Sequence, residues 1–163
     1  MCNLPVFTEV NDTEFALLKA DIEAYSRLCG YYVICLFSIR DFRVEGLSQE
    51  AILEGLIHYF DDSSMQLDAL GATHNWMDCE VPPDRANAHV IESLVGGRRI
   101  GHFNKTMSES TAGELFDRFV TVCGANPRFY INLELGNLDY VFMYGVLVVA
   151  DDIAGLLWIV EDD

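Results

Sequence analysis

Two long stretches of the chain constrain the fold most, because as β-strands they would carry apolar side chains on both faces. They run from 31 to 39 and from 138 to 149, and both are rich in β-branched and aromatic residues. A strand with apolar side chains on both faces is favoured in the interior of a sheet. The longest apolar run, 141–150, is too short to span a bilayer as a helix. The sequence therefore predicts two interior strands and no transmembrane helix.

Four other segments combine helix start signals with apolar residues at helical spacing, so each predicts a helix. A starting Asn, Ser, Asp or Thr can accept hydrogen bonds from the first backbone amides, and glycine commonly follows the last turn. On these signals the first helix begins at Asn11, with Glu14 as its capping-box partner, and ends at Gly30; its buried face is expected to hold Phe15, Leu18, Ile22, Tyr25 and Cys29.

The other three predicted helices follow the same signals. The second begins at Ser48, and the third begins at Asp84 and ends at Gly96–Gly97. The fourth begins at Ser108 or Thr111 and ends at Gly124.

From residue 129 onward the chain has the pattern of β structure. Apolar and more polar residues alternate from 129 to 135, with Tyr130 on the polar side, which predicts one strand with a single buried face. Turn residues lie at 136–137 and 151–152, and the last strand is expected over 155–160. Two further short strands are expected over 72–78 and 98–104.

The predicted order is a helix, a strand, three helices and then strands. This order predicts an α+β fold: an antiparallel sheet with a C-terminal β-meander, and about four helices packed mainly on one face. The 163 residues contain no internal repeat and no linker rich in Pro, Ser or Gly. We therefore expect a single domain over 1–163.

The net charge is the one extreme feature of the composition. Twenty-six Asp and Glu residues against ten Lys and Arg give a charge of −16. No Lys or Arg occurs over 44–84 or from 129 to the end, whereas Arg85, Arg98, Arg99 and Lys105 lie together between these acidic blocks. Contacts to phosphate groups need Lys and Arg, so we expect no nucleic-acid partner and no membrane partner. If the two acidic blocks meet in space, their field will attract a basic partner.

The chain start and the cysteines indicate a compartment. The first residues have neither the basic region nor the apolar region of a signal peptide. Five widely spaced cysteines without a C-x-x-C pair are typical of reduced thiols rather than of a disulfide framework or a zinc site. We therefore expect a cytoplasmic protein.

Side chains that could carry chemistry do not form a known motif. The four histidines, His58, His74, His89 and His102, lack metal-ligand spacing. The glycine-rich segment 96–102 lacks the Lys-Ser/Thr pair of a phosphate-binding loop, and the acids of 61–68 do not follow the spacing of a calcium loop. We therefore expect no catalytic residue, no cofactor and no metal ion, and favour a protein that is not an enzyme.

Partner contacts are expected from the acidic blocks instead. Trp76 lies among acids, as aromatic anchors of interfaces do, although a core position beneath a loop is an equal alternative. The predicted partner-binding residues are Asp61, Asp62, Asp68, Trp76, Asp78, Glu80, Asp151 and Asp152.

These features favour an acidic protein that binds and inhibits a basic one. By analogy of charge and size, its most concrete form is a bacterial immunity protein, which occludes the active site of a basic toxin or effector such as a nuclease. Three alternatives stay open: a secretion chaperone or adaptor, a nucleic-acid mimic, and an enzyme with a site of unfamiliar pattern. A chaperone would need an exposed apolar groove as well as the acids.

Overall fold

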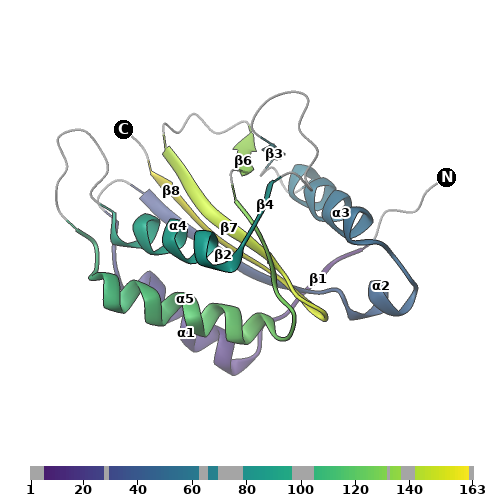
Figure 1. Ribbon diagram of the computed structural model, residues 1–163, viewed down its shortest axis with the longest axis horizontal. Coiled ribbons are helices and arrows are strands. Elements are labelled where there is room, and N and C mark those ends of the chain that lie inside the picture. The colour runs from purple at the N-terminus through teal and green to yellow at the C-terminus, as the bar shows by residue number, and fades with distance from the viewer. Residues whose placement is uncertain are drawn as a thin grey trace.

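The computed structural model describes residues 6–27, 30–62, 66–69, 79–96, 105–131, 133–136 and 142–161. The elements, in chain order, are β1 (Thr8–Glu9), α1 (Thr13–Glu23), β2 (Gly30–Ser38), α2 (Arg40–Val44), α3 (Gln49–Asp62), β3 (Gln66–Ala69), β4 (Glu80–Val81), α4 (Pro83–Val95), α5 (Glu109–Cys123), β5 (Arg128–Tyr130), β6 (Leu133–Gly136), β7 (Phe142–Val149) and β8 (Ile153–Glu161). The predicted α+β class with an antiparallel sheet is confirmed (Figure 1).

The main sheet has six antiparallel strands in the order β1-β2-β8-β7-β5-β4. The central strand β8 pairs with β2 from Gly30↔Glu161 to Ser38↔Ile153, and with β7 from Phe142↔Glu161 to Val149↔Ala154. Strand β2 lies between β1 and β8 and includes residues 31–38 of the first apolar stretch, and β7 lies between β8 and β5 and includes residues 142–149 of the second. The two predicted interior strands are thus interior in the strand order, and β1 pairs with β2 only at Phe37 and Ser38. Strands β3 and β6 form a separate two-stranded sheet.

Helices cover both faces of the main sheet, which explains why its inner strands are apolar on both faces. Helices α1, α4 and α5 lie on one face, and α3 lies on the other (Figure 1). Successive residues of β8 alternate between the two cores: Leu157 and Ile159 pack with α1, α4 and α5, whereas Leu156 and Trp158 pack with α3. Trp158 is buried, as predicted.

Three of the four helix starts follow the sequence signals. The amide of Ala51 donates to Oγ of Ser48 at 3.1 Å, and the amide of Thr111 donates to Oγ of Ser108 at 3.1 Å. The third helix begins one residue before the expected Asp84, at Pro83. Gly96 and Gly124 end α4 and α5 with φ angles of 76° and 102°, where glycine is favoured.

The expected first helix is wrong at both ends. Its N-cap is Asp12 rather than Asn11, and Oδ1 of Asp12 accepts from the Phe15 amide at 2.8 Å. It ends at Glu23, so Tyr25 lies beyond it and is 37% exposed rather than buried. Gly30 does not end a helix but begins β2, where a Cβ atom would collide with the backbone carbonyl of Val160. A close approach of two strands, not a helix stop, explains this glycine.

The predicted single strand over 129–135 is also wrong. Its residues divide between β5 in the main sheet and β6 in the small sheet. Tyr130 is fully buried, and its hydroxyl accepts a hydrogen bond from Nε2 of Gln49 in α3 at 3.0 Å. The predicted strands over 72–78 and 98–104, like 138–141, lie outside the described residues, whereas β1 and α2 had no sequence signal. Within the described ranges, no helix has the length and apolar character needed to cross a membrane.

Candidate functional site

The predicted partner-binding residues lie in separate parts of the fold. The α3–β3 region holds one group, the β7–β8 turn holds a second, and β4 holds Glu80. Figure 1 shows the end of α3 and β3 at the top of the molecule, away from the β7–β8 turn at its lower right. Asp61 and Asp62 end α3, Asp68 lies in β3, Glu80 begins β4, Asp151 and Asp152 form the β7–β8 turn, and Trp76 and Asp78 lie outside the described residues.

Glu80 already has a partner within the chain. Arg128 in β5 donates from Nε to Oε2 of Glu80 at 2.9 Å and from Nη2 to Oε1 at 2.5 Å. The hydrogen bonds from Arg128 hold the pKa of Glu80 below its ordinary value. This bidentate pair joins the two strands β4 and β5, which pair at Glu80↔Tyr130. A partner protein would have to compete with Arg128 for this carboxylate.

The turn between β7 and β8 presents its two carboxylates at the surface. Asp151 and Asp152 are exposed, and Oδ2 of Asp151 accepts from Nδ2 of Asn126 at 2.8 Å. The backbone of the turn is held from the side, because Nη2 of Arg43 donates to the Ala150 carbonyl at 3.0 Å and the Ile39 amide donates to the Asp152 carbonyl at 2.8 Å. These hydrogen bonds therefore hold the backbone of the turn that carries the two exposed carboxylates.

Almost all acids with described side chains face solvent. Of these eighteen residues, only Glu80 and Glu161 are half-buried, and each of the two binds an arginine. The exposed acids are Glu9, Asp12, Glu14, Asp21, Glu23, Asp41, Glu45, Glu50, Glu54, Asp84, Glu92, Glu109, Glu114, Asp117, Asp151 and Asp152.

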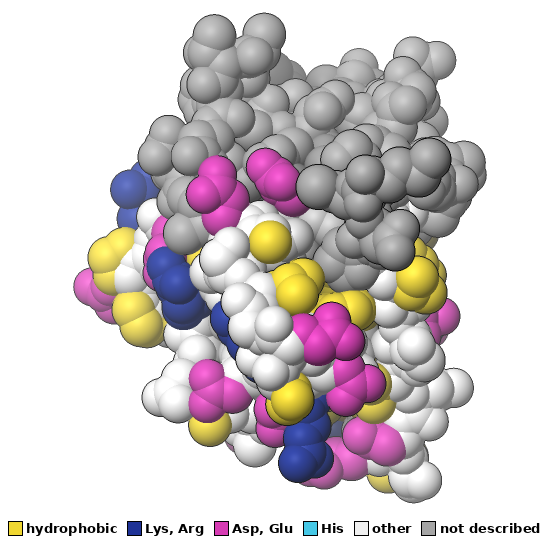
Figure 2. Space-filling view, turned by 90° about the vertical axis from the view of Figure 1, so that its right-hand side faces the viewer, with side chains coloured by type: hydrophobic (Ala, Val, Ile, Leu, Met, Phe, Trp, Pro, Cys, Tyr) yellow, Lys and Arg dark blue, Asp and Glu magenta, His cyan; other side chains and the backbone are white. Residues whose placement is uncertain are grey.

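Half of the described bases, in contrast, are engaged in ion pairs within the chain. Eight Lys and Arg residues lie in the described ranges, and four of them pair with acids: Lys19 with Glu23, Arg27 with Glu161, Arg118 with Asp21 and Arg128 with Glu80. At the end of the molecule that carries α2, acidic side chains lie in separate groups with basic ones between them (Figure 2). The acids whose side chains are described are thus distributed over several elements of the fold, inside and outside the two acidic blocks.

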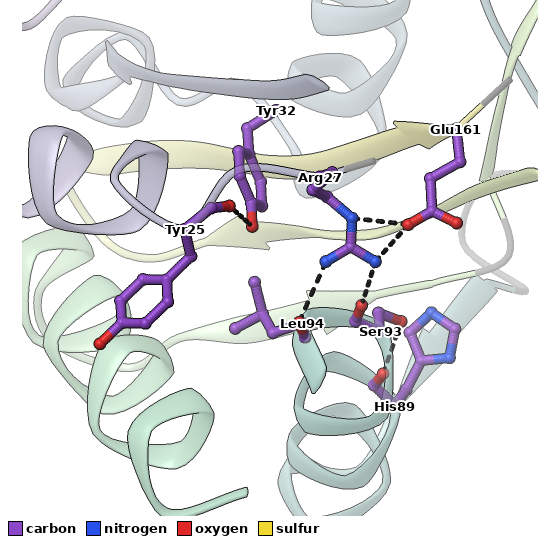
Figure 3. A network of polar contacts seen from close by, with 7 residues as sticks. All are labelled: Tyr25, Arg27, Tyr32, His89, Ser93, Leu94 and Glu161. Atoms are coloured by element: carbon purple, nitrogen blue, oxygen red, sulfur yellow. Dashed lines mark hydrogen bonds and ion pairs between the residues drawn. The ribbon is translucent and has the colours of Figure 1, made fainter. Parts of the chain in front are cut away.

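Arg27 occupies the one strongly buried ionic network of the described residues (Figure 3). Its Nε donates to Oε1 of Glu161 at 2.6 Å, and its two terminal nitrogens donate to the carbonyls of Leu94 at 3.0 Å and Ser93 at 3.1 Å. Those carbonyls belong to the last turn of α4, so the guanidinium also satisfies a helix C-terminus. Cζ of the Arg27 guanidinium lies 5.7 Å from the ring centre of Tyr32. The network ties α4 to the ends of β2 and β8, which is a structural role.

A groove lies between α1 and α5 on the described surface. Two adjoining hollows, of about 250 and 690 Å³, follow the two antiparallel helices. We call this surface the α1–α5 groove; it is lined by Glu14, Leu17, Leu18, Asp21, Ala24, Tyr25, Thr111, Glu114, Leu115, Asp117, Arg118, Thr121 and Val122.

The charges of the α1–α5 groove are mostly negative. Glu14 and Asp21 come from α1, and Glu114 and Asp117 come from α5. Arg118 is the one base of the lining, and its Nη1 lies 2.9 Å from Oδ2 of Asp21. These acids lie outside both base-free blocks of the sequence, which is why charge blocks did not identify them. Spacing of three and four residues along each helix was the available signal, but only the fold brings the two helices together.

Thiol chemistry is disfavoured at Cys35 and Cys123. Burial raises the pKa of Cys35 to about 12, and burial likewise raises the pKa of Cys123 to about 12. Both thiols therefore stay protonated at neutral pH. In the part of the chain that the structure describes, no three His, Cys, Asp or Glu side chains gather as a metal site would require.

Comparison with protein-family models, with curated proteins and with solved structures finds no match to this chain.

Proposed function

We propose that this protein binds a basic protein and inhibits it, most concretely as a cytoplasmic immunity protein that occludes the active site of a basic toxin or effector. The observation that carries the proposal is the unequal use of charge. The chain has a net charge of −16, the acids whose side chains are described are exposed unless an arginine binds them, and half of the described bases are engaged in ion pairs. The negative charge is therefore available to a partner.

Electrostatic attraction is the first step of the proposed mechanism. A strongly charged surface raises the rate of encounter with an oppositely charged protein by about 10- to 1000-fold, and salt weakens this effect. In the complex, carboxylates would take the place of substrate phosphates opposite the Lys and Arg side chains of the partner. Close, desolvated charge pairs of this kind couple by about 1.5–7 kcal/mol.

The proposed contacts are those of the eight predicted partner-binding residues. The β7–β8 turn offers the exposed carboxylates of Asp151 and Asp152, and we propose Asp61 and Asp62, the last two residues of α3, as a second group. Asp68, Trp76 and Asp78 belong to the same proposal. Glu80 contributes less, because Arg128 already holds its carboxylate.

The test is capture followed by an activity assay. Tagged protein is immobilised and exposed to an extract of the source cell at low salt, and bound proteins are released at high salt. An unrelated protein of similar net charge serves as the control for non-specific adsorption. We expect one basic protein to be retained stoichiometrically by this chain alone, and its activity to disappear when this chain is added.

Two results would contradict the proposal. Either no basic protein is retained beyond the control, or the retained protein keeps its full activity in the complex. Retention of many partly folded clients would favour the chaperone hypothesis instead.

A further inference from the structure

The α1–α5 groove combines exposed apolar side chains with an acidic rim. Leu17 is 60% exposed and Tyr25 is 37% exposed, and both line the groove. Glu14, Leu17 and Asp21 recur along α1 at intervals of three and four residues, so they form one stripe along the helix. Protein interfaces combine an apolar centre with a polar rim, and this stripe offers both kinds of contact to a partner.

The charge of the groove selects the chemistry of its occupant. The positive charge of Arg118 is balanced by Asp21, which it contacts at 2.9 Å. Three carboxylates of the lining, those of Glu14, Glu114 and Asp117, remain in excess. A segment that buries apolar side chains against Leu17 therefore needs Lys or Arg on its flanks to complement them.

The shape of the groove selects the form of that segment. Helix α1 has 11 residues and is therefore about 16 Å long, which corresponds to roughly three helical turns. The groove is formed by two antiparallel helices, against which a third helix can pack with its side chains. A partner strand, in contrast, would need exposed backbone groups at a sheet edge.

We propose that the α1–α5 groove is the docking surface for a basic amphipathic helix of the protein partner. The apolar face of that helix would cover Leu17 and Tyr25, and its flanking Lys and Arg side chains would face Glu14, Glu114 and Asp117. This inference rests on the proposed function and names the surface and the partner segment that the binding uses.

The first test uses a synthetic probe, a labelled amphipathic helical peptide of Leu and Lys of about fourteen residues. A peptide of the same composition, scrambled so that its apolar face is lost, is the matched probe control. Binding is followed by fluorescence anisotropy, and the contact surface is located by backbone amide NMR shifts. We expect the amphipathic peptide to shift amides of α1 and α5, and to bind at least tenfold more tightly than the scrambled peptide.

Variants of the protein distinguish binding in the α1–α5 groove from general electrostatic attraction to an acidic protein. The double substitution E114K/D117K reverses two carboxylates of the groove, and E50K/E54K makes the same change of charge on exposed positions of α3. We expect E114K/D117K to weaken peptide binding at least tenfold and E50K/E54K to weaken it about twofold. The uncharged substitution L17S should weaken it several-fold. Equal losses in the two charge variants, or no effect of L17S, would overturn the inference.

Replacement variants and the captured partner separate a failure of the groove proposal from a failure of the proposed function. If E114K/D117K does not fold, the milder E114Q/D117N replaces it, with E50Q/E54Q as its control. If the captured basic protein binds E114K/D117K as tightly as the native chain, the groove proposal fails while the proposed function stands. If the peptide occupies the groove but no basic protein is captured, the proposed function fails while the groove stands.

Discussion

Nε of Arg27 lies 2.6 Å from Oε1 of Glu161, a residue 134 positions later in the chain. The same guanidinium donates to the Ser93 and Leu94 carbonyls at the end of α4. Because Glu161 is the last residue of β8, one side chain joins the end of the central strand to a helix and to the segment before β2. The contact places a positive charge inside an acidic protein, where it serves the fold.

Removal of the Arg27 side chain should therefore lower the stability of the folded protein. Arg27→Met keeps much of the side-chain volume but leaves the Glu161 carboxylate and two helix carbonyls without their donor. Breaking a buried ion pair from one side costs about 3–5 kcal/mol. We expect a loss of this size in the free energy of unfolding by urea. Arg27→Lys, which keeps the charge but not the planar set of donors, should recover only part of it. An unchanged stability of Arg27→Met would show that the network is dispensable.

The Glu80–Arg128 pair should contribute a small, pH-dependent stability. The pKa of Glu80 is lowered in the folded protein, so the unfolded chain binds a proton more readily. The contribution is therefore present at neutral pH and is lost as the pH falls through the folded-state pKa, below 4.5. Both side chains are partly exposed, which limits the effect of Glu80→Gln to about 0.5–1 kcal/mol.

Urea unfolding of the native chain and Glu80→Gln at pH 7 and near pH 3 measures this contribution. The difference between the two proteins should shrink at the lower pH. A difference that grows toward acid would contradict the assigned direction of the pKa shift.

The described thiols should be inert in the folded state. A rise in the pKa of Cys35 and Cys123 from 9.0 to about 12 lowers their thiolate fraction about a thousand-fold at pH 8. In the double variant C2S/C29S, the thiols that remain are Cys35, Cys79 and Cys123. We expect a disulfide reagent to react with them on unfolding and hardly at all before it. Rapid reaction of all three in native buffer would refute this expectation.

Gly155 in β8 should not tolerate a side chain. A Cβ atom there would lie 2.6 Å from Sγ of Cys123 and 2.9 Å from Cζ of Phe119, because α5 packs directly on the strand. Overpacking of this kind costs about 1–3 kcal/mol. We expect Gly155→Ala to lower the thermal midpoint, and Cys123→Ala to restore part of the loss because it removes the nearest atom. Additive effects of the two substitutions would argue against this contact.

Local signals in the sequence identified the fold class and most of the elements. The apolar stretches of β2 and β7 and the capping residues Ser48 and Ser108 act through neighbouring residues, so a single sequence reveals them. The role of Gly30 was missed because it depends on the carbonyl of Val160, which is distant in the chain. Tyr130 was placed on the polar side because its partner Gln49 comes from another element.

The site was harder to predict for the same reason. The two acidic blocks of the sequence left open whether their acids meet in space, and the fold separates the end of α3 from the β7–β8 turn (Figure 1). It also brings Glu14 and Asp117, which belong to neither block, to one groove. Which acids share a surface depends on helix packing, and composition carries no information about that.

The central claim is that the acidic surface of this protein attracts a basic protein partner by charge. The most direct measurement is the association rate of the captured partner with the native chain and with D61K/D62K, at salt concentrations from about 10 mM to about 1 M, where screening becomes nearly complete. We predict a rate that falls by about 10- to 1000-fold across this range, and a slower, less salt-dependent rate for the variant. A rate that is independent of salt in both proteins would contradict the account.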